Sequence, residues 1–294
     1  MGIQSALDPA GPDAALIAEI TWVLFAGGAA IFVLVMALAA WAVLKPPPWL
    51  ARRGAIVVGG IAFPLVVLFA LLVYTLIRAN ALSAGEPVLR VEVTGHQWWW
   101  HIAYLGADGA VDFVTANELR IPVGQPVEIR LRSADVLHSF WVPSLAGKLD
   151  LIPGKDNRLI LSASRAGTFR GQCAEYCGGP HAQMAFYVVA TETLEEWRAL
   201  QRQPASASND LFNARCAACH TVRGTSAAGT LGPDLTHVGG RVSIGAGILP
   251  NNRGALAGWI ASSQHIKPGN LMPSFRELSG EELAALAAYL ESLN

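Results

Sequence analysis

Two long apolar runs without a charged residue constrain this chain more than any other feature of its sequence. They extend from Ile20 to Leu44 and from Gly54 to Ile77. A helix rises about 1.5 Å per residue, so each run is long enough to cross a hydrocarbon layer about 30 Å thick. Pro64 interrupts the second run, which a membrane helix tolerates when neighbouring groups satisfy the freed carbonyl. We expect a hairpin of two transmembrane helices, over about residues 17–44 and 54–78.

The charges around the two runs predict how the hairpin is oriented. The segment between the runs contains Lys45, Arg52 and Arg53 and no acid, whereas the preceding tail is acidic and has no Lys or Arg. The positive-inside rule therefore places this loop in the cytoplasm and both chain ends outside. No signal peptide is recognisable, because no basic segment precedes the first run and that run is too long.

The overall composition agrees with a protein that lies partly in a membrane. Apolar residues make up 52% of the 294 residues, charged residues make up 15%, and the mean hydropathy is +0.38. This balance disfavours the alternative that the two runs are buried helices of a soluble core. The formal net charge is −1, and the sequence has no Lys/Arg-rich run. Nucleic acid is therefore excluded as a partner.

After the hairpin the hydrophobic pattern changes to the period of a β-strand. Apolar and polar residues alternate from Leu89 to Thr94 and from Val127 to Arg132, and further apolar segments occur at 159–161 and 185–189. Alternation of this kind is typical of half-buried strands. We expect an all-β sandwich or small barrel over residues 86–191, outside the membrane.

The C-terminal third is predicted to be a separate helical domain. A short helix at 194–201 is followed by the small-residue segment Pro204–Asn209, which suggests a linker. The final helix has Ser279 as its N-cap and Glu282 three residues later, a capping box. The predicted regions are 1–80 for the tail and hairpin, 86–191 for the sandwich, 192–208 for the helix and linker, and 209–294 for the helical domain.

The four cysteines form two close pairs, Cys173 with Cys177 and Cys216 with Cys219. Disulfide bonds are the ordinary expectation in an extracytoplasmic domain, where oxidising conditions permit them. Here, however, each pair is followed by a histidine and then a methionine, which are ligands for metals and haem iron. We therefore favour binding of metal and haem by the two pairs.

The second pair predicts covalent attachment of haem c. The sequence Cys216-Ala-Ala-Cys219-His220 has the spacing at which two thiols form thioethers to a porphyrin and the next imidazole binds the iron. Met272 is the only methionine of this domain and is the expected sixth ligand, since a His/Met pair raises the haem potential as an electron carrier requires. His237 and His265 are the alternatives for that position.

The first pair lies in a cluster of soft ligands that predicts copper. Its members are two thiols, two imidazoles and a thioether: His138, Cys173, Cys177, His181 and Met184. Histidine, cysteine and a weak methionine on a β-sandwich are typical of electron-transfer copper. One copper needs a single cysteine, whereas two thiolates on one loop can bridge two copper ions, each completed by one histidine. Zinc bound by two cysteines and two histidines is the alternative, but it would leave Met184 unused.

The chain resembles cytochrome c oxidase subunit II over nearly its whole length, specifically the bacterial form with a C-terminal cytochrome c domain. The resemblance is carried by the cysteine loop and by three further segments in the order of the family: 95–100 with Gly95-His-Gln-Trp98-Trp-Trp100, 135–143 with Asp135-Val-Leu-His138, and 147–154 with Gly147-Lys-Leu-Asp. It implies a multi-domain membrane protein: a two-helix transmembrane hairpin, an all-β cupredoxin-like sandwich and an all-α class I cytochrome c domain.

The resemblance also implies roles for individual residues. It assigns a dinuclear copper centre, CuA, to His138, Cys173, the carbonyl of Glu175, Cys177, His181 and Met184. It further assigns a magnesium ion to the Glu175 carboxylate at the boundary with a catalytic subunit, and the entrance of electrons to Trp98. A solvated loop acid and simple aromatic packing are the alternatives for these two residues. Trp99 and His101 stand where the family usually has tyrosine and serine, which leaves the entrance route open.

The function implied by the resemblance is that of the electron-accepting subunit of a respiratory terminal oxidase. Electrons from an external donor, such as a cytochrome c or a quinol-oxidising complex, would pass through haem c to CuA and on to subunit I. That subunit would carry haems and CuB, reduce oxygen to water and couple this reaction to proton pumping, together with a subunit III. No oxygen chemistry is expected on this chain, because its two membrane runs contain no histidine.

The same resemblance implies a place in the cell and leaves two rival functions. We expect the bacterial inner membrane, with the N-terminus, the CuA domain and the cytochrome c domain on the periplasmic face. The rivals are a CuA subunit of a nitric or nitrous oxide reductase complex and a membrane-anchored copper-delivery protein. Glu175 and the two-helix hairpin favour the oxidase. A delivery protein needs exchangeable ligands and gives no reason for an attached haem.

Overall fold

The computed structural model describes residues 4–45, 47–49, 52–79, 85–205 and 207–294. The chain divides into two compact units, one made of Met1–Ala14 and Gly85–Asn294 and the other of Ala15–Ala84. Two positions used in the sequence-based boundaries, residue 80 and Ser206 of the predicted linker, lie outside the described residues.

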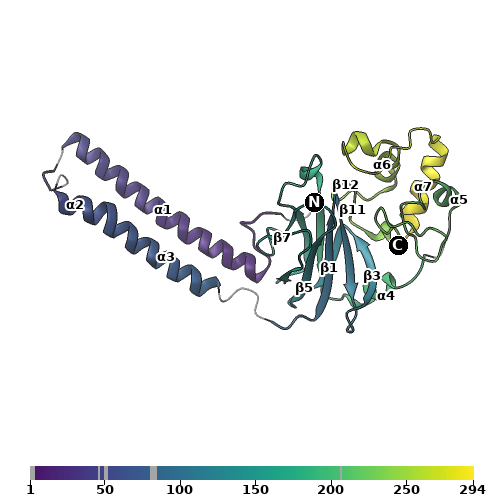
Figure 1. Ribbon diagram of the computed structural model, residues 1–294, viewed down its shortest axis with the longest axis horizontal. Helices are drawn as coiled ribbons and strands as arrows, with labels where there is room; N and C mark the ends of the chain where they lie inside the picture. Colours follow the sequence, from purple (N-terminus) through teal and green to yellow (C-terminus); the bar gives the residue numbers. More distant parts are fainter. Residues whose placement is uncertain (1–3, 46, 50–51, 80–84, 206) are drawn as a thin grey trace. The chain divides into compact units, whose positions relative to one another are not determined.

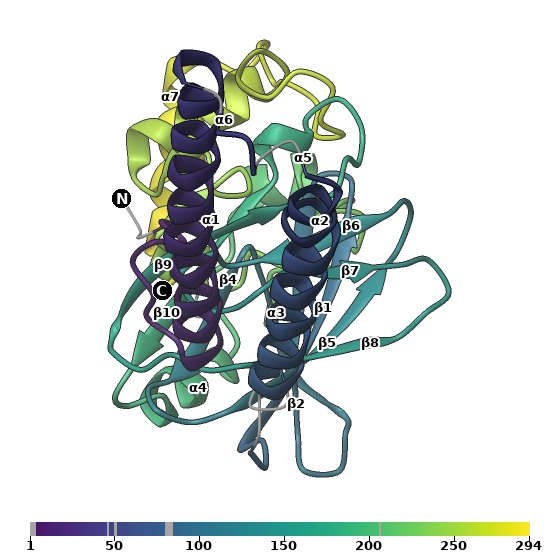
Figure 2. The same ribbon diagram turned by 90° about the vertical axis from the view of Figure 1, so that its left-hand side faces the viewer.

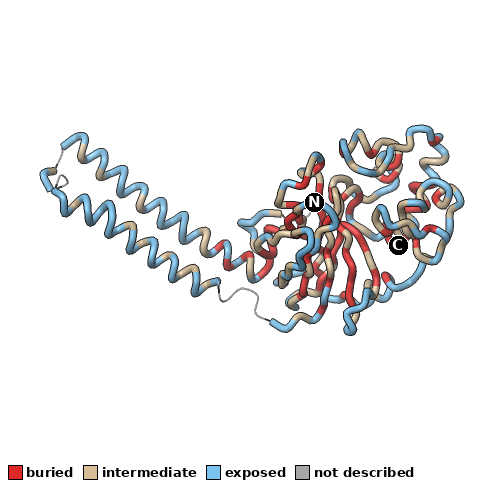
Figure 3. The backbone as a smooth tube through the Cα atoms, in the orientation of Figure 1, coloured by how far each residue is buried: buried red, intermediate tan, exposed pale blue. Residues whose placement is uncertain are grey.

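The N-terminal hairpin is formed by two long apolar helices. The first is α1 (Pro12–Leu44), and the second is continuous from α2 (Arg53–Val57) through η1 (Val58–Ala62) to α3 (Phe63–Ala79). Figure 1 and Figure 2 both show the two helices side by side. Their surfaces are largely exposed in Figure 3, and both are long and apolar enough to cross a membrane. The predicted two-helix architecture is therefore confirmed.

The segment η1 is a single π-helical turn, and Pro64 explains it. Proline has no backbone N–H, so the carbonyl four residues earlier loses its usual partner. The helix responds by widening: the N–H of Phe63 bonds the carbonyl of Val58, five residues back. A local change to π geometry is one of the ways in which a membrane helix satisfies the backbone groups that a proline frees. The interruption noted in the sequence thus becomes a local change of pitch, and the helix continues to Ala79.

Two five-stranded sheets form the predicted all-β sandwich, visible as the bundle of labelled strands in Figure 1. One sheet has the order β3-β2-β1-β5-β8 and the other β4-β10-β9-β6-β7. The strands and the short helix η2 have these bounds: β1 Leu89–His96, β2 Trp99–Leu105, β3 Val111–Ala116, β4 Glu118–Pro122, β5 Val127–Ser133, β6 His138–Trp141, β7 Leu149–Leu151, β8 Asn157–Leu161, β9 Gly167–Cys173, η2 His181–Gln183 and β10 Ala185–Thr191.

The alternating residues seen in the sequence face the interior of the sandwich. Every second residue of β1 from Leu89 is buried, and β5 pairs with β1 in parallel so that Val91 lies opposite Ile129. Each large apolar side chain that is fully buried contributes about 1.5–3 kcal/mol to folding. Large aromatic residues complete this core at the end of the sandwich that carries β6: Trp100, Phe140 and Phe186.

The C-terminal domain has its own apolar core, built around Phe212, Ile260, Leu286 and Leu290. A short helix α4 (Glu195–Gln201) precedes it, and its elements are α5 Asp210–Arg215, η3 Val238–Gly240, β11 Ser243–Ile244, β12 Leu249–Pro250, α6 Arg253–Ile266 and α7 Gly280–Ser292. The capping box predicted at Ser279 and Glu282 is confirmed. The small ladder of β11 with β12 is an addition to the helical pattern expected from the sequence.

Candidate metal and haem sites

Strand pairing brings distant parts of the sequence to one end of the sandwich. Strand β6 begins with His138 and runs antiparallel to β9, which ends with Cys173, so that Phe140 lies opposite Cys173. The loop after Cys173 returns to β10 at Met184, whose carbonyl accepts a hydrogen bond from the Cys173 N–H at 2.8 Å. His138, Cys173 and Met184 are therefore held at the same end by backbone pairing.

Around this end, five soft donor groups converge. The sulfurs of Cys173 and Cys177 lie 3.7 Å apart. The Nδ1 atom of His138 lies 3.8 Å from the Cys173 sulfur, and Nδ1 of His181 lies 3.5 Å from the Cys177 sulfur. The sulfur of Met184 lies 3.8 Å from that of Cys177. Each cysteine thus has its own histidine, and both cysteines are free thiols.

The donor atoms of His138, Cys173 and Cys177 are close enough together to hold a metal ion, and this cluster lies inside the protein. His138 is fully buried, and Cys173, Cys177 and Met184 are each at most 4% exposed. In the described part of the chain, His138, Cys173 and Cys177 are the set whose donor atoms all lie within 4.8 Å of one another. Buried thiols and imidazoles that face each other in this way suit a soft cation.

Asp135 orients the buried histidine, and the sequence reasoning missed it. Its Oδ1 lies 2.8 Å from Nε2 of His138, and its other oxygen accepts the N–H of Gln97 at 2.7 Å. An Nε2–H that donates to a carboxylate leaves Nδ1 with its lone pair toward the sulfurs, which is how second-layer groups set the tautomer of metal-binding histidines. An acid three residues before the predicted ligand was the available signal.

The two thiols do not ionise alike. A hydrogen bond from Cys177 lowers the pKa of Cys173 to about 3. The pKa of Cys177 is raised, first because its proton is held by Cys173 and then because the group is buried. The first proton therefore leaves the pair easily and the second is retained. The lowered pKa of Cys173 favours its thiolate, which is the form that binds metal ions.

Glu175 presents two different groups to its surroundings. Its backbone carbonyl lies 3.2 Å from the Cys173 sulfur, within the donor cluster. Its carboxylate instead lies 3.6 Å from the Nζ atom of Lys148, and its side chain is 38% exposed. The carbonyl predicted as a copper ligand is therefore at the cluster, whereas the carboxylate predicted for magnesium is on the accessible side of the loop.

Trp98 lies directly on the cysteine loop. Its indole Nε1 donates to the carbonyl of Cys177 at 2.9 Å, and the Gln97 side chain donates to the same carbonyl at 2.7 Å. The ring also leaves no space for a side chain at position 178, because a Cβ at Gly178 would lie 2.9 Å from it. Trp98 is thus in hydrogen-bond contact with a residue of the predicted copper site.

The haem motif follows α5 in the C-terminal domain. The N–H of His220 bonds the carbonyl of Cys216 at 3.0 Å, so the motif folds into a tight turn. Nδ1 of His220 lies 2.8 Å from the carbonyl of Pro233, which fixes a proton on Nδ1 and leaves Nε2 free for iron. Burial lowers the pKa of His220, so the imidazole is neutral, as a ligand must be. These features fit a covalently held haem.

Met272 is held by the end of helix α6. This helix has a non-helical residue at Ser262, after which Ser263 Oγ and Gln264 Nε2 donate to the Met272 carbonyl at 2.8 and 2.7 Å. The Met272 side chain packs against the C-terminal core. The two alternatives for the sixth ligand are placed differently: His265 is exposed, and both ring nitrogens of His237 lie within 3.0 Å of carbonyl oxygens.

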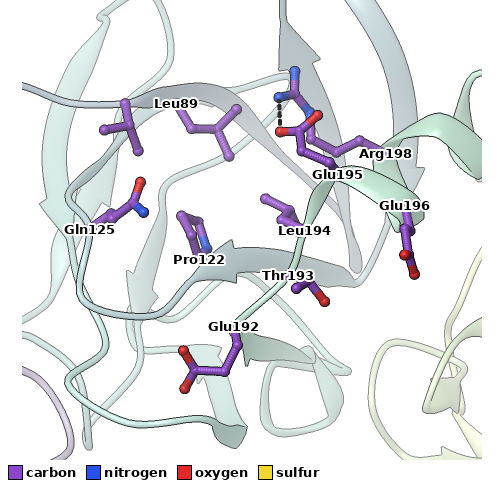
Figure 4. A pocket seen from close by; sticks show the side chains of 10 residues that line it. Leu89, Pro122, Gln125, Glu192, Thr193, Leu194, Glu195, Glu196 and Arg198 are labelled. Carbon is purple, nitrogen blue, oxygen red and sulfur yellow. Dashed lines mark hydrogen bonds and ion pairs between the residues drawn. The ribbon is translucent and has the colours of Figure 1, made fainter.

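A surface pocket on the sandwich, shown in Figure 4, is separate from these groups. Apolar side chains such as Leu89, Pro122 and Leu194 line it together with acidic residues near α4, and Arg198 forms an ion pair with Glu195. The residues that line it are Val88, Leu89, Pro122, Gln125, Glu192, Thr193, Leu194, Glu195, Glu196 and Arg198. None of them is a predicted site residue, so the pocket adds nothing to the metal or haem sites.

Two segments of the chain match known protein families. Residues 105–191 match the family described as "Cytochrome C oxidase subunit II, periplasmic domain", and residues 205–294 match the family described as "Cytochrome c". The first match contains the cysteine loop and His138. The second contains the Cys216–His220 motif and Met272. Both sites deduced from the residues therefore fall inside families whose names agree with them.

Two curated relatives are both named cytochrome c oxidase subunit 2. Cytochrome c oxidase subunit 2 of Alkalihalophilus pseudofirmus is 40% identical over 222 residues, covering 72% of this chain and 63% of the relative. That of Bacillus subtilis is 32% identical over 230 residues, covering 71% and 63%. The chain thus spans less than two thirds of the length of these relatives. A solved periplasmic domain of subunit II from Bradyrhizobium japonicum is 30% identical with a TM-score of 0.38, covering 41% of this chain and 97% of that chain.

Proposed function

Because this chain joins the periplasmic domain of cytochrome c oxidase subunit II to a cytochrome c domain, we propose that it is the electron-accepting subunit of a respiratory terminal oxidase. Two apolar helices and a periplasmic domain make it a membrane-anchored protein. The proposal rests mainly on one observation: the sulfurs of Cys173 and Cys177 each lie within 3.8 Å of a different histidine.

The copper site in this proposal is dinuclear CuA. The proposed ligands are the side chains of His138, Cys173, Cys177, His181 and Met184 and the backbone carbonyl of Glu175. Two thiols at 3.7 Å, each within 3.8 Å of a different imidazole nitrogen, support a site for two ions in preference to one mononuclear site. The lowered pKa of Cys173 favours the thiolate form that copper binds.

The haem site in this proposal belongs to the C-terminal domain. Cys216 and Cys219 would form the two thioethers, and His220 and Met272 would be the two protein ligands of the iron. The free Nε2 of His220 and the anchored Met272 backbone support this assignment. Gly229 allows its own segment to pack closely against the motif, because a Cβ at this position would lie 2.5 Å from the backbone of Cys219.

A third ion, magnesium, is proposed at the edge of the copper loop. The carboxylate of Glu175 would bind it at the boundary with the catalytic subunit. The partial exposure of this carboxylate, while the carbonyl of the same residue faces Cys173, supports the assignment. Oxygen ligands are the ones magnesium prefers. Loss of bound Mn²⁺, used as a paramagnetic substitute, in Glu175→Gln would test it in the assembled complex.

When bound, haem c and CuA would be one-electron carriers between an external donor and the catalytic subunit. In this order, haem c would receive the electron before CuA. In this proposal the donor is a cytochrome c or a quinol-oxidising complex. Subunit I carries haems and CuB, reduces oxygen to water and pumps protons, together with a subunit III. Trp98, bonded to the Cys177 carbonyl, is proposed as the point where electrons reach the copper site. The membrane is the bacterial inner membrane, with both domains on the periplasmic side.

The copper-to-iron ratio of the full chain tests the proposal. The protein would be expressed with its haem, purified in detergent, loaded with copper and examined by electron paramagnetic resonance. We expect two copper ions per haem iron, with hyperfine structure spread equally over both copper nuclei. One copper with a mononuclear spectrum would indicate a copper carrier, and zinc in place of copper would indicate a structural site. Either result would overturn the oxidase assignment.

A further inference from the structure

The cytochrome c domain makes direct hydrogen bonds to the copper-binding end of the sandwich. The N–H of Ala185, the residue after Met184, donates to the carbonyl of Ala246 at 2.9 Å. The side chain of Gln183 donates to the carbonyl of Ile266, at the end of α6, at 3.2 Å. We call Trp98, Gln183 and Ala185 the docking face.

Lys267 provides the third of these bonds, and it is the most unusual group in the contact. It is 2% exposed, and its Nζ atom donates to the carbonyl of Trp98 at 2.7 Å and to that of Gly245 at 3.3 Å. An ammonium group is strongly hydrated in water, and its burial is costly unless hydrogen-bond acceptors replace the water. The two carbonyls, one from each domain, supply this replacement.

Through Trp98, the contact of Lys267 reaches the cysteine loop. The carbonyl of Trp98 accepts from Lys267, while its indole donates to the carbonyl of Cys177 at 2.9 Å. Trp98 therefore accepts a hydrogen bond from the cytochrome c domain at its carbonyl and donates one to the cysteine loop from its ring. A displacement of Lys267 would change the position of the cytochrome c domain relative to Trp98 and to the cysteine loop.

We propose that Lys267 is a positioning residue, which holds the cytochrome c domain on the docking face as a fixed module and prevents it from moving as a shuttle between donor and copper. The inference rests on the proposed function for its purpose, but the docking itself does not depend on it. Burial also lowers the pKa of Lys267 to about 7, so the group is near its midpoint at neutral pH and donates to carbonyls in either protonation state.

Two other observations agree with a fixed position. A second contact between the domains lies at β4, where Glu118 accepts the N–H of Val242 at 2.7 Å and Arg120 donates to the carbonyl of Gly240 at 3.0 Å. Within the connection between the domains, the carbonyl of Gln201 accepts from Arg223 at 2.6 Å, and the N–H of Ala205 donates to the Arg223 carbonyl at 2.7 Å. The described parts of this connection are thus bonded to the domain they join.

Amide hydrogen exchange of the full chain in detergent, with its haem attached, tests the proposal. The reporter is the N–H of Ala185, which is protected by the Ala246 carbonyl only while the domains are docked. In Lys267→Met we expect its protection to fall about ten-fold or more, since the two hydrogen bonds of the Lys267 Nζ atom are together worth about that factor. Lys267→Gln keeps a donor and should restore part of the protection. Lys155→Met, at an exposed lysine of the sandwich, is the matched control.

Two internal amides separate loss of docking from loss of folding. The N–H of Cys173 bonds Met184 within the sandwich, and that of Val222 bonds Ala227 within the cytochrome c domain. Both should keep their protection in Lys267→Met. Unchanged protection at Ala185, or an equal loss at all three amides, would overturn the proposal.

A kinetic readout connects the docking to electron transfer. In the copper-loaded protein, Lys267→Met should slow electron transfer from haem to copper after a light-triggered reduction, while the redox potentials and the copper spectrum stay unchanged. A changed copper spectrum with an unchanged rate would contradict a positioning role. If the copper-to-iron ratio shows no CuA, the proposed function fails, but the exchange experiment still decides whether Lys267 fixes the domain.

Discussion

The sulfur atoms of Cys173 and Cys177 lie 3.7 Å apart as free thiols, each facing a different histidine. A disulfide would bring them to about 2.05 Å and would remove both as metal ligands. The observed separation instead leaves the lone pairs of both sulfurs available. In the structure described, Cys173 and Cys177 are therefore not bonded to each other, and substitution of either one tests the copper assignment directly.

Replacement of Cys177 by serine should abolish the dinuclear copper signal. Serine keeps the size of the side chain but removes the soft thiolate that is needed for a bridge. Electron paramagnetic resonance of the copper-loaded chain is the measurement. Cys219→Ser is the matched control, because it alters haem attachment and should leave the copper spectrum intact. A dinuclear signal that persists in Cys177→Ser would show that the bridging assignment is wrong.

Asp135→Asn should weaken copper binding without removing a ligand. The carboxylate accepts from Nε2 of His138, and loss of such second-layer partners lowers metal affinity by about 10–100-fold. Competition with a copper chelator gives the affinity. Asp156→Asn is the control, since that exposed carboxylate pairs with Arg132 at 2.7 Å and does not contact the cluster ligands. Equal affinities of the two variants would argue against orientation of His138 by Asp135.

Gly232→Ala should disturb the axial imidazole of the haem. A Cβ at this position would lie 2.7 Å from Cε1 of His220, so the ring or the loop must move. We expect a partly high-spin absorption spectrum with the haem still covalently attached. Gly258→Ala is the control, because no atom lies within 4 Å of its Cβ position. If both variants retain the wild-type spectrum, His220 has more freedom than the structure indicates.

Met272→Ala should leave covalent haem in place and change its axial field. The thioethers depend on Cys216 and Cys219, whereas the sixth position depends on the thioether sulfur of Met272. Visible and magnetic circular dichroism spectra would report the change. Leu271→Ala, at a neighbouring residue that is 79% exposed, should have no such effect. An unchanged spectrum in Met272→Ala would mean that another residue binds the iron.

Acid should release helix α4 from the sandwich through Asp112. Hydrogen bonds from Arg202, and also the charge of Arg198, lower the pKa of this carboxyl. A folded-state pKa below the unfolded value of about 3.9 means that the stabilisation is present above that pH and is lost as the pH falls through the folded-state pKa. At neutral pH, Asp112→Asn should therefore cost about 0.5–1 kcal/mol, as partly exposed pairs do.

Limited trypsin digestion after Arg198 and Arg202 measures this release. Cleavage at these sites should be faster in Asp112→Asn than in the wild type at neutral pH, with no change for Asp108→Asn, an acid of the same hairpin that caps Ala110. Exchange of the α4 amides, which can be followed in acid, should show the two proteins converge at low pH. A difference that persists below the folded-state pKa would contradict the ion-pair mechanism.

Local patterns predicted the parts of the fold that depend on nearby residues. The capping box at Ser279 needs only residues three positions apart, and the buried alternation in β1 needs only a period of two. The two cysteine motifs are local for the same reason. These features were readable because the responsible atoms are covalently close.

Long-range relationships were not readable from local patterns. The approach of His138 to Cys173 depends on β6 pairing with β9 across 35 positions. The residue types suggested His138 as a copper ligand, but no local pattern predicted the strand pairing that brings it to the cysteines. The N-terminal tail showed only its charge, yet Ala10 is buried and bonds Ser144 and Ser164. Lys267 reads as an ordinary solvated lysine at a helix end. Its burial depends on the surface of another domain, which no spacing within its own helix can reveal.

The hydrogen bonds between the cytochrome c domain and the sandwich have a consequence for affinity. A tethered domain experiences an effective concentration of its partner surface on the order of millimolar. An interface with an intrinsic dissociation constant of about 10 μM would then be occupied about 99% of the time. A few hydrogen bonds such as those of Glu118, Gln183 and Lys267 are sufficient under these conditions. A separate cytochrome that visited the same face would be governed by its bulk concentration and by salt, whereas occupancy by the attached domain is independent of dilution.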